Sequence, residues 1–264
     1  MQKFSYIKNI ILLSGITAIM GILAFTLERS EINDITVINV NGNKYLDSDE
    51  YLKFANLNDV SNKVDLNIAL IHDRLMKHPY VKNADVVMLE RGEVEVKIIE
   101  KKFDAILLTD EDHFLVSDEA EIIPSLSLTR NIDLPIIVNK QADNISAFDN
   151  AVKINELMCA LKIISAAEVF DNEFCESISE INLTKEKNII INITGVPYPI
   201  YFGHNNEIAK TIYLSKVLKH LQRNDLSKYL NYVDLRFEDL VYLGFNENLS
   251  AEKENIWKRK LLLG

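Results

Sequence analysis

Residues 79–101 read PYVKNADVVMLERGEVEVKIIEK. On both sides of a short Arg-Gly-Glu turn, apolar residues alternate with polar ones, first at Ala84, Val86 and Met88 and then at Val94, Val96 and Ile98. A period of two predicts a pair of antiparallel strands, each with one buried face. Nothing in the stretch resembles a nucleophile, a metal ligand or a phosphate-binding loop, so we expect its role to lie in strand pairing.

The residues before this hairpin predict a small domain built around it. Residues 35–40 (ITVINV) have strand character, and the turn signal NGN follows them. Two helices are expected next, one from a cap at Asp47 or Ser48 to Ala55 and one over Leu66–Lys77. The resulting β-α-α-β-β order predicts two helices on one face of a three-stranded sheet.

After Phe103 the pattern changes to short strands separated by polar turns. The strands are expected at residues 103–109, 113–117, 121–124, 134–138, 178–184, 188–194, 198–203, 232–237 and 240–245. Two helices are expected, over Ala147–Val169 and Asn205–Gln222. The inward stripe of the second is predicted at Ile208, Ile212, Ser215, Leu218 and Leu221. We therefore predict one curved, mostly antiparallel sheet that carries two helices.

The N-terminus contains an uncharged apolar run, Ile10–Leu27. At 1.5 Å per residue, its 18 residues span roughly 27 Å, close to the thickness of a bilayer core. Lys3 and Lys8 precede the run, which favours a cytoplasmic N-terminus. A retained single-pass anchor is therefore expected. The alternative is a cleaved signal peptide, for which the run is long and lacks a good A-x-A-like site.

Composition narrows the class of function. The chain has 264 residues, enough for two domains, and a net charge of −10. No long basic stretch, GxGxxG or GxxxxGK[ST] pattern occurs, which argues against nucleic-acid and phosphate-loop functions. Cys159 and Cys175 are expected to be two buried free thiols, with a disulfide as the alternative.

Several short motifs carry a family resemblance through their order and spacing. They are Ile38-x-Val40-x-Gly42-Asn43, Pro79-x-Val81-x-x-Ala84-x-Val86, Val94-x-Val96-x-Ile98-x-Glu100-Lys101, LVSDEAEIIP, an LP near residue 135, YFG before a helix containing Lys210, and YVDLRF. This set resembles a POTRA domain and, more narrowly, the FtsQ/DivIB family of bacterial cell-division proteins. The chain departs from the family at turn positions, which are Gly92, Phe103, Ala120 and Asn139.

The resemblance implies an α+β fold with a single N-terminal transmembrane helix, a POTRA domain and a C-terminal β domain. The implied segments are a cytoplasmic tail at 1–9, an anchor at 10–27, a POTRA domain at 34–101, a β domain at 102–248 and a tail at 249–264. The implied function is a non-enzymatic scaffold in the cytoplasmic membrane at the division septum, with no cofactor or metal. It would bind FtsB/DivIC-type and FtsL-type proteins and other divisome membrane proteins, and link them to septal peptidoglycan synthesis.

The last expected strand is the candidate partner-binding site. An exposed edge offers unpaired N–H and C=O groups to an incoming strand. The candidate residues are Asp234, Arg236, Leu240, Val241, Tyr242, Leu243, Gly244 and Phe245. Asp234 and Arg236 form either an orienting ion pair beside the edge or a solvated face of little energetic value. The alternative for the edge is that residues 250–263 fold back as a helix and cover it.

Two rival functions remain open from the sequence. An anchored hydrolase is one, but the five histidines are scattered and no HExxH or GxSxG occurs. A POTRA component of an envelope assembly or secretion machine is the other, and such proteins carry several POTRA units or a β-barrel. His204, at a strand-to-helix turn, is interpreted as a cap or turn residue instead of a ligand.

Overall fold

The computed structural model describes residues 12–22, 35–59, 66–130, 132–139, 145–184, 188–237 and 240–246. Residues 12–22 are helical. Within the described ranges, no helix combines the length and apolar character that crossing a membrane requires. Residues 10–11 and 23–27 of the predicted anchor lie outside the described residues, as does the predicted tail at 249–264.

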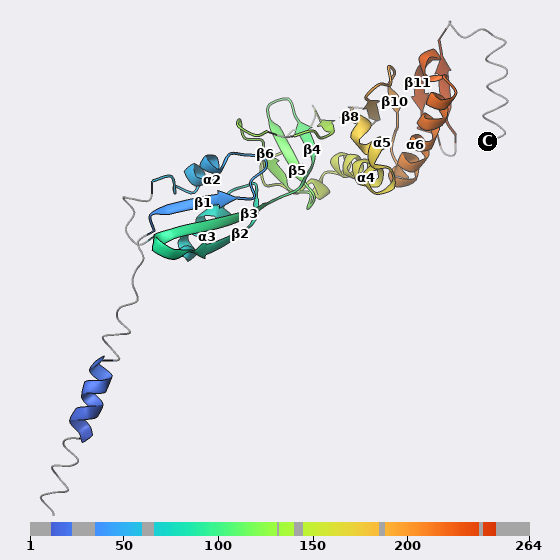
Figure 1. The fold of residues 1–264 in the computed structure, drawn as a ribbon. Coiled ribbons are helices and arrows are strands. Elements are labelled where there is room, and N and C mark those ends of the chain that lie inside the picture. Colours follow the sequence, from blue (N-terminus) through green and yellow to red (C-terminus); the bar gives the residue numbers. More distant parts are fainter. Residues whose placement is uncertain are drawn as a thin grey trace, which may run out of the picture.

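The first folded unit is a three-stranded sheet with two helices (Figure 1). Its elements are β1 Val37–Asn41, α2 Ser48–Phe54, α3 Ile68–Met76, β2 Val81–Met88, the 3₁₀ turn η1 Glu90–Gly92, and β3 Glu93–Glu100. The strand order is β1-β3-β2, with β1 parallel and β2 antiparallel to β3. The hairpin predicted from residues 79–101 is therefore confirmed, and its second strand is the centre of the sheet.

The alternation in β3 sets the core of this unit. Val94, Val96 and Ile98 are at most 2% exposed, and they pack with Ile71 and Leu75 from α3. The intervening residues of β3 are polar and lie towards solvent. The alternation of apolar and polar residues thus gives the sheet one face that is covered by helices and one that is exposed to solvent, as the sequence predicts.

The Gly-Asn and Glu-Lys motifs are explained by the turn after β1. Gly42 has φ +86°, and a Cβ there would lie 2.3 Å from the carbonyl oxygen of Ile98, so only glycine fits without displacing the central strand. The carboxylate of Glu100 accepts hydrogen bonds from the N–H groups of Lys44 (2.8 Å) and Tyr45 (3.1 Å) and from the hydroxyl of Tyr51. Glu100 thereby fixes the turn and α2 to the end of β3.

The second unit is a sheet of nine described strands. They are β4 Phe103–Leu108, β5 His113–Ser117, β6 Ile122–Pro124, β7 Ile136–Val138, β8 Ile178–Leu183, β9 Ile189–Ile193, β10 Ile200–Tyr201, β11 Leu230–Asp234 and β12 Tyr242–Phe245. Their order is β12-β11-β10-β9-β8-β7-β4-β5-β6. The pairs β4–β7, β7–β8 and β10–β11 are parallel, and the other five are antiparallel. The sheet is therefore mixed, with antiparallel pairs in the majority.

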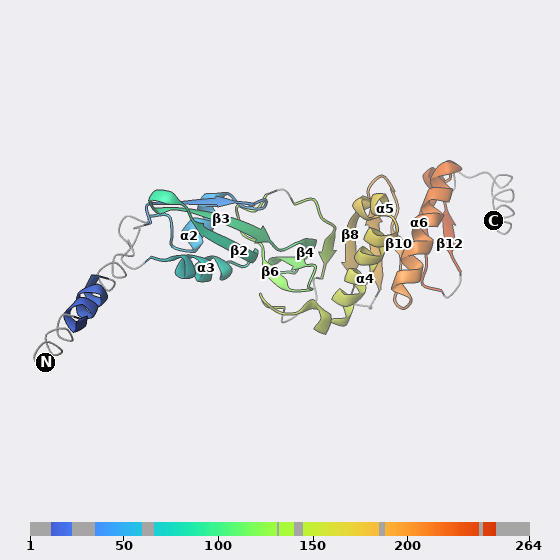
Figure 2. The same ribbon diagram turned by 60° about the horizontal axis from the view of Figure 1, so that its bottom comes forward.

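Helices cover one face of this sheet (Figure 2). They are α4 Asn155–Phe170, α5 Asn172–Ser177 and α6 Glu207–Arg223, with 3₁₀ turns η2 Ala151–Lys153 and η3 Ser227–Tyr229. The prediction of two helices was wrong, because the described part of this unit has three. The short α5 begins at a separate cap, where the Asp171 carboxylate accepts from the N–H of Phe174 at 3.3 Å.

Two details of the predicted helices were also wrong. The first begins at Asn155 instead of Ala147, because the chain before it pairs with β6: Phe148 N–H donates to the Ile122 carbonyl at 2.6 Å. In α6, Ile208 is 57% exposed, whereas Thr211 is buried with its hydroxyl donating to the Glu207 carbonyl. A threonine satisfied within its own helix can occupy a core position that hydropathy alone does not assign to it.

The two units meet through a continuous apolar contact. Leu115 and Ile123, from β5 and β6, belong to the core of the three-stranded unit. The buried Tyr80 hydroxyl lies 2.7 Å from the Thr129 hydroxyl and accepts from the N–H of Leu126 at 2.9 Å. Because apolar packing and satisfied hydrogen bonds both cross the junction, we infer that the units do not move as free domains.

Candidate functional site

The two ends of the nine-stranded sheet differ in how they are covered. At β6, residues 148–151 lie along the outer side: Phe148 and Ile122 share a main-chain hydrogen bond, and Ala151 N–H donates to the Ala120 carbonyl at 2.8 Å. At the other end, β12 pairs with β11, and no strand in the described ranges pairs with its outer side. In that part of the chain, β12 is the open end of the sheet.

The main-chain direction in β12 follows from one hydrogen bond. Asn246 N–H donates to the Tyr229 carbonyl at 2.8 Å, so it points toward the β11 side. N–H directions alternate along a strand. The N–H groups of Gly244 and Tyr242 therefore also face β11, and those of Leu243 and Phe245 face the open edge.

The side chains of this segment also divide between two faces. Val241, Leu243 and Phe245 pack, partly buried, against the core under the helices. Tyr242, 49% exposed, and Gly244 lie on the opposite face. The edge is thus held in place by its apolar side chains while its outer main chain remains available to another strand.

Aromatic rings form a row on that opposite face. A Cβ on Gly244 would lie 2.2 Å from the ring of Tyr232, so this ring covers the glycine. Tyr232 contacts Tyr201 with ring centroids 5.9 Å apart, and the Arg236 guanidinium lies 5.1 Å from the Tyr201 ring centre. An aromatic ring over an edge glycine stabilises an otherwise weak strand position.

Asp234 and Arg236 form an ion pair with unequal burial. The Asp234 side chain is 6% exposed and that of Arg236 is 41% exposed. Burial raises the pKa of the Asp234 carboxyl, but hydrogen bonds from the Arg236 side chain and main chain outweigh this and hold the pKa below its ordinary value. The orienting-pair interpretation fits this geometry, and the solvated-face alternative does not fit a carboxylate that is nearly inaccessible.

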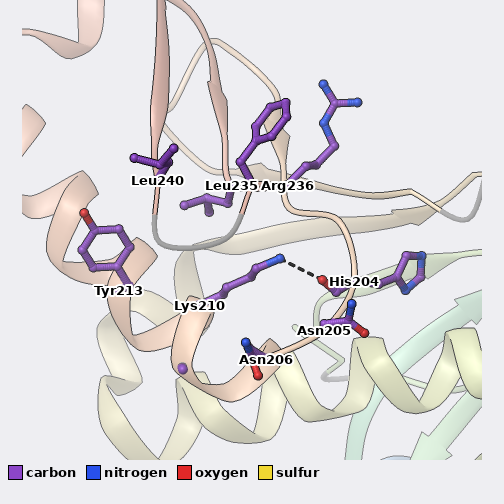
Figure 3. Close-up of a pocket in the computed structure, with 10 residues that line it drawn as sticks. His204, Asn205, Asn206, Lys210, Tyr213, Leu235, Arg236 and Leu240 are labelled. Carbon is purple, nitrogen blue, oxygen red and sulfur yellow. Dashed lines mark hydrogen bonds between the residues drawn. The ribbon is translucent and has the colours of Figure 1, made fainter.

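A pocket of about 460 Å³ lies between the start of α6 and the residues that follow β11 and precede β12 (Figure 3). It is lined by His204, Asn205, Asn206, Ala209, Lys210, Tyr213, Leu235, Arg236, Phe237 and Leu240. The Lys210 ammonium donates to the His204 carbonyl at 2.8 Å, across the floor of the pocket. Tyr213 and Leu240 are each more than half exposed. The pocket therefore offers one wall of apolar surface and one of cationic and amide groups.

The chain topology explains why these distant residues meet. β10 and β11 are parallel and α6 connects them. The segments that follow parallel strands emerge at the same edge of a sheet, so residues 203–206 lie beside residues 235–237. Sequence reasoning placed Asp234 and Arg236 at the site but quoted Tyr201 and Lys210 only as family motif residues. It did not single out Tyr213, because a pairing across β10 and β11 leaves no local signal.

The remaining predicted residues fall as follows. Leu240 and Val241 precede β12, which starts at Tyr242 instead of Leu240, and Leu240 lines the pocket. Both cysteines are free but only partly buried, whereas the first of the two alternatives predicted buried free thiols. His204 lies in the turn before α6, as predicted, but its side chain also lies close to Cys159 and Glu207. No sequence spacing signals that proximity.

Comparison with known proteins assigns the two units. A family model of the FtsQ-type POTRA domain matches residues 34–101, and one of the C-terminal region of cell division protein FtsQ/DivIB matches residues 105–236. The chain belongs to the FtsQ/DivIB family. The predicted POTRA domain and C-terminal β domain are therefore confirmed as the fold, and β12 lies beyond the matched residues.

Two curated FtsQ/DivIB relatives are similar over part of the chain. The cell division protein FtsQ of Bradyrhizobium diazoefficiens is 27% identical over 41% of this chain and 32% of its own length. That of Myxococcus fulvus is 21% identical over 71% of this chain and 64% of its own length. The matched part of the chain thus spans about one third of the length of the Bradyrhizobium protein and just under two thirds of the length of the Myxococcus protein.

A solved structure from the same family is also similar. It is the major extracytoplasmic domain of the cell division protein DivIB from Geobacillus stearothermophilus, at 13% identity and a TM-score of 0.30, over 48% of this chain and 98% of that chain.

Proposed function

We propose that this FtsQ/DivIB-family chain is a non-catalytic scaffold of the bacterial division machinery. It binds FtsB/DivIC-type and FtsL-type partners by adding a partner strand to β12, and so helps to link them to septal peptidoglycan synthesis. The observation that carries the proposal is the outer side of β12, where the N–H groups of Leu243 and Phe245 face an edge that no described strand occupies.

The energetics of such an edge favour a partner of extended conformation. Each main-chain hydrogen bond formed there contributes about 0.5–1.5 kcal/mol net, so a few bonds alone give weak binding. Specificity and further affinity come from side-chain sites beside the ladder. Here those sites are the Arg236 guanidinium, the exposed Tyr242 ring and the pocket lined by Leu240 and Lys210.

The proposed location is the cytoplasmic membrane at the division septum, with the N-terminus in the cytoplasm. Residues 10–27 form the proposed single-pass anchor. Supporting this, residues 12–22 are helical and their large apolar side chains are at least half exposed, namely Leu12, Leu13, Ile16, Ile19, Met20 and Ile22. Exposed apolar side chains on a helix are expected where lipid surrounds it.

The two rival functions are less well supported. A POTRA component of a secretion machine is disfavoured because the second unit matches the FtsQ/DivIB C-terminal region instead of a barrel or a further POTRA unit. A hydrolase is disfavoured because the family is one of non-catalytic scaffolds.

Localisation and depletion test the proposed function in cells. A fluorescently tagged full-length chain should gather at midcell before constriction, and depletion should produce filaments. A tagged unrelated single-pass protein provides the control for general envelope signal. A dispersed signal together with normal septation in depleted cells would overturn the proposal.

A further inference from the structure

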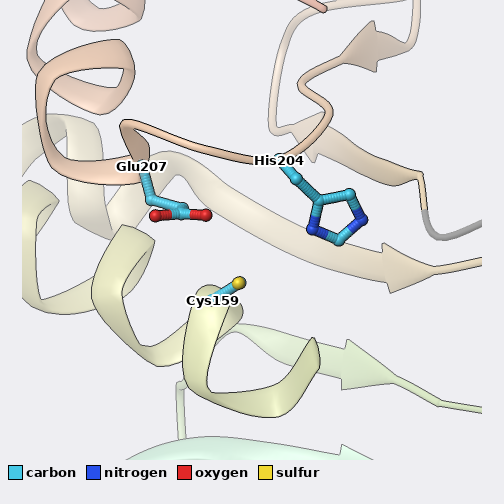
Figure 4. Close-up of side chains that lie close together, drawn as sticks. All are labelled: Cys159, His204 and Glu207. Atoms are coloured by element: carbon cyan, nitrogen blue, oxygen red, sulfur yellow. The ribbon is translucent and has the colours of Figure 1, made fainter. Parts of the chain in front are cut away.

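Three metal-ligating side chains meet between α4 and the start of α6 (Figure 4). Cys159 comes from α4, His204 from the turn before α6, and Glu207 from the first residue of α6. One ligand atom of each, the thiol sulfur, an imidazole nitrogen and a carboxylate oxygen, lies within 4.8 Å of the other two. All three residues are partly buried, so the cluster is neither a solvated surface group nor sealed from solvent.

The surroundings of the cluster bring the thiol and the carboxylate together. The Cys159 thiol lies within 4.8 Å of the Glu207 carboxylate, and burial, followed by the proximity of this carboxylate, raises the pKa of Cys159 to about 11. Glu207 Oε1 accepts from the N–H of Asn205 at 3.0 Å. The carboxylate is therefore fixed over the thiol by the turn that carries His204.

The third group shows an unsatisfied polar atom. Nε2 of His204 is buried and has no hydrogen-bond partner in the described part of the chain. In Figure 4, Nε2 points away from Cys159 and Glu207, and Nδ1, the ring nitrogen next to Cγ, faces them. Nδ1 is therefore the ligand atom, and the proton of the neutral ring is carried by Nε2.

We propose that Cys159, His204 and Glu207 bind one Zn²⁺ ion. Thiolate, imidazole and carboxylate are the three ligand types that zinc takes in proteins, and a water completes four-coordination. Binding forms the Zn–S bond as the thiol proton leaves to solvent, so affinity rises with pH as that proton is lost more readily. The ion would join α4 to the turn at residues 204–206 and stiffen that wall of the pocket.

Cobalt substitution tests the site, since Co²⁺ occupies zinc sites and a bound thiolate gives a charge-transfer absorption in the near ultraviolet. The full chain, purified in detergent and freed of metal with a chelator, is titrated with Co²⁺ and then with Zn²⁺. We expect one Co²⁺ per chain, the thiolate band, and loss of the band as Zn²⁺ displaces cobalt. A titration without the thiolate band would overturn the proposal.

Substitutions then assign the ligands. Cys159→Ser should abolish the thiolate band, while His204→Ala and Glu207→Gln should each weaken Zn²⁺ binding by at least about tenfold. Cys175→Ser, at the other partly buried thiol, is the matched control and should bind as the wild type. Zn²⁺ should raise the melting temperature of the wild type and of Cys175→Ser but not of Cys159→Ser. Equal binding by Cys159→Ser and the wild type would contradict the assignment, and none of these readouts requires a division partner.

Discussion

Arg236 donates two parallel hydrogen bonds to the carboxylate of Asp234, from Nε to Oδ1 at 3.0 Å and from Nη2 to Oδ2 at 2.6 Å. The Arg236 N–H also donates to Oδ1 at 3.0 Å, so the carboxylate fixes both the side chain and the main chain after β11. Charge-assisted bidentate pairs of this kind define geometry as well as energy. The guanidinium is thereby held above the Tyr201 ring and beside the pocket.

Removing the carboxylate should therefore affect stability and partner binding together. We expect Asp234→Ala to lower the free energy of unfolding by about 1–3 kcal/mol, because it removes the bidentate pair with Arg236 and the main-chain bond that ends β11. Urea unfolding of the variant measures this. Asp73→Ala, which breaks the exposed helix pair with Lys77, is the control and should cost less than about 0.5 kcal/mol. Equal effects of the two variants would contradict the role given to Asp234.

Gly244 should tolerate a side chain only when Tyr232 makes room. The alanine methyl group in Gly244→Ala would meet the Tyr232 ring at 2.2 Å, and moving the ring loses its contact with Tyr201. We expect a cost of about 1–2 kcal/mol in unfolding free energy. In the double variant Gly244→Ala/Tyr232→Ala, the cost should be smaller than the sum of the two single costs. Strict additivity would show that the ring does not cover the glycine.

The POTRA domain should lose stability in mild acid through His78. This side chain is 2% exposed, and burial lowers its pKa from 6.5 to about 4. Between those pH values, the unfolded chain binds a proton that the folded chain does not. The free energy of unfolding is therefore unaffected by His78 above about pH 6.5. It falls by up to about 3 kcal/mol as the pH drops toward 4.

Unfolding at a series of pH values measures this loss. His78→Asn keeps an acceptor near the N–H of Tyr80, which donates to His78 Nδ1 at 3.1 Å. The variant should be less stable at pH 7 but should show a flatter dependence between pH 6.5 and 4. His72→Gln, at an exposed helix position, is the control and should leave the wild-type slope unchanged. An unchanged slope in His78→Asn would exclude His78 as its source.

Proline in β12 should separate partner binding from folding. Leu243→Pro removes an N–H that faces the open edge, so the ladder with β11 keeps its bonds. We expect recovery of an FtsB/DivIC-type partner in co-purification to fall about tenfold, which corresponds to about 1.4 kcal/mol. The N–H of Val241, two residues before Leu243, faces the same side of the strand, so Val241→Pro should act similarly.

A matched proline control lies in the other sheet. Leu89 N–H donates to the Glu93 carbonyl at 2.7 Å, so the N–H of Met88 points away from β3, at the outer side of β2. Met88→Pro makes the same change at the POTRA edge and should leave partner recovery near the wild-type level. If Met88→Pro reduces recovery and Leu243→Pro does not, the binding edge is that of the POTRA domain.

The sequence predicts the local features of the fold better than its long-range pairings. The hairpin of residues 79–101 follows from its own alternation, because register and burial are set by the same period of two. The stripe of α6 was misplaced at Ile208, whose position in the first helical turn leaves it exposed. Hydropathy cannot distinguish a buried isoleucine from one at the end of a helix.

In the candidate site too, local features could be predicted from the sequence and long-range contacts could not. Arg236 could be identified because it belongs to the YVDLRF motif, and the β12 segment because it is the last strand that the sequence predicts. Tyr201, Lys210 and Tyr213 join them only through the parallel pairing of β10 with β11, which joins strands that are separated by a whole helix. The meeting of Cys159 with His204 depends on packing between α4 and the turn before α6, which no spacing in the sequence encodes.

Residue-resolved amide hydrogen exchange tests the proposed strand addition most directly. Exchange in the full chain is measured with and without a purified FtsB/DivIC-type partner. The amides of Leu243 and Phe245, which face the open edge, should slow by at least about tenfold in the complex, whereas those of Tyr242 and Gly244, already directed at β11, should change less. A complex that forms with no added protection at Leu243 and Phe245 would contradict binding through β12.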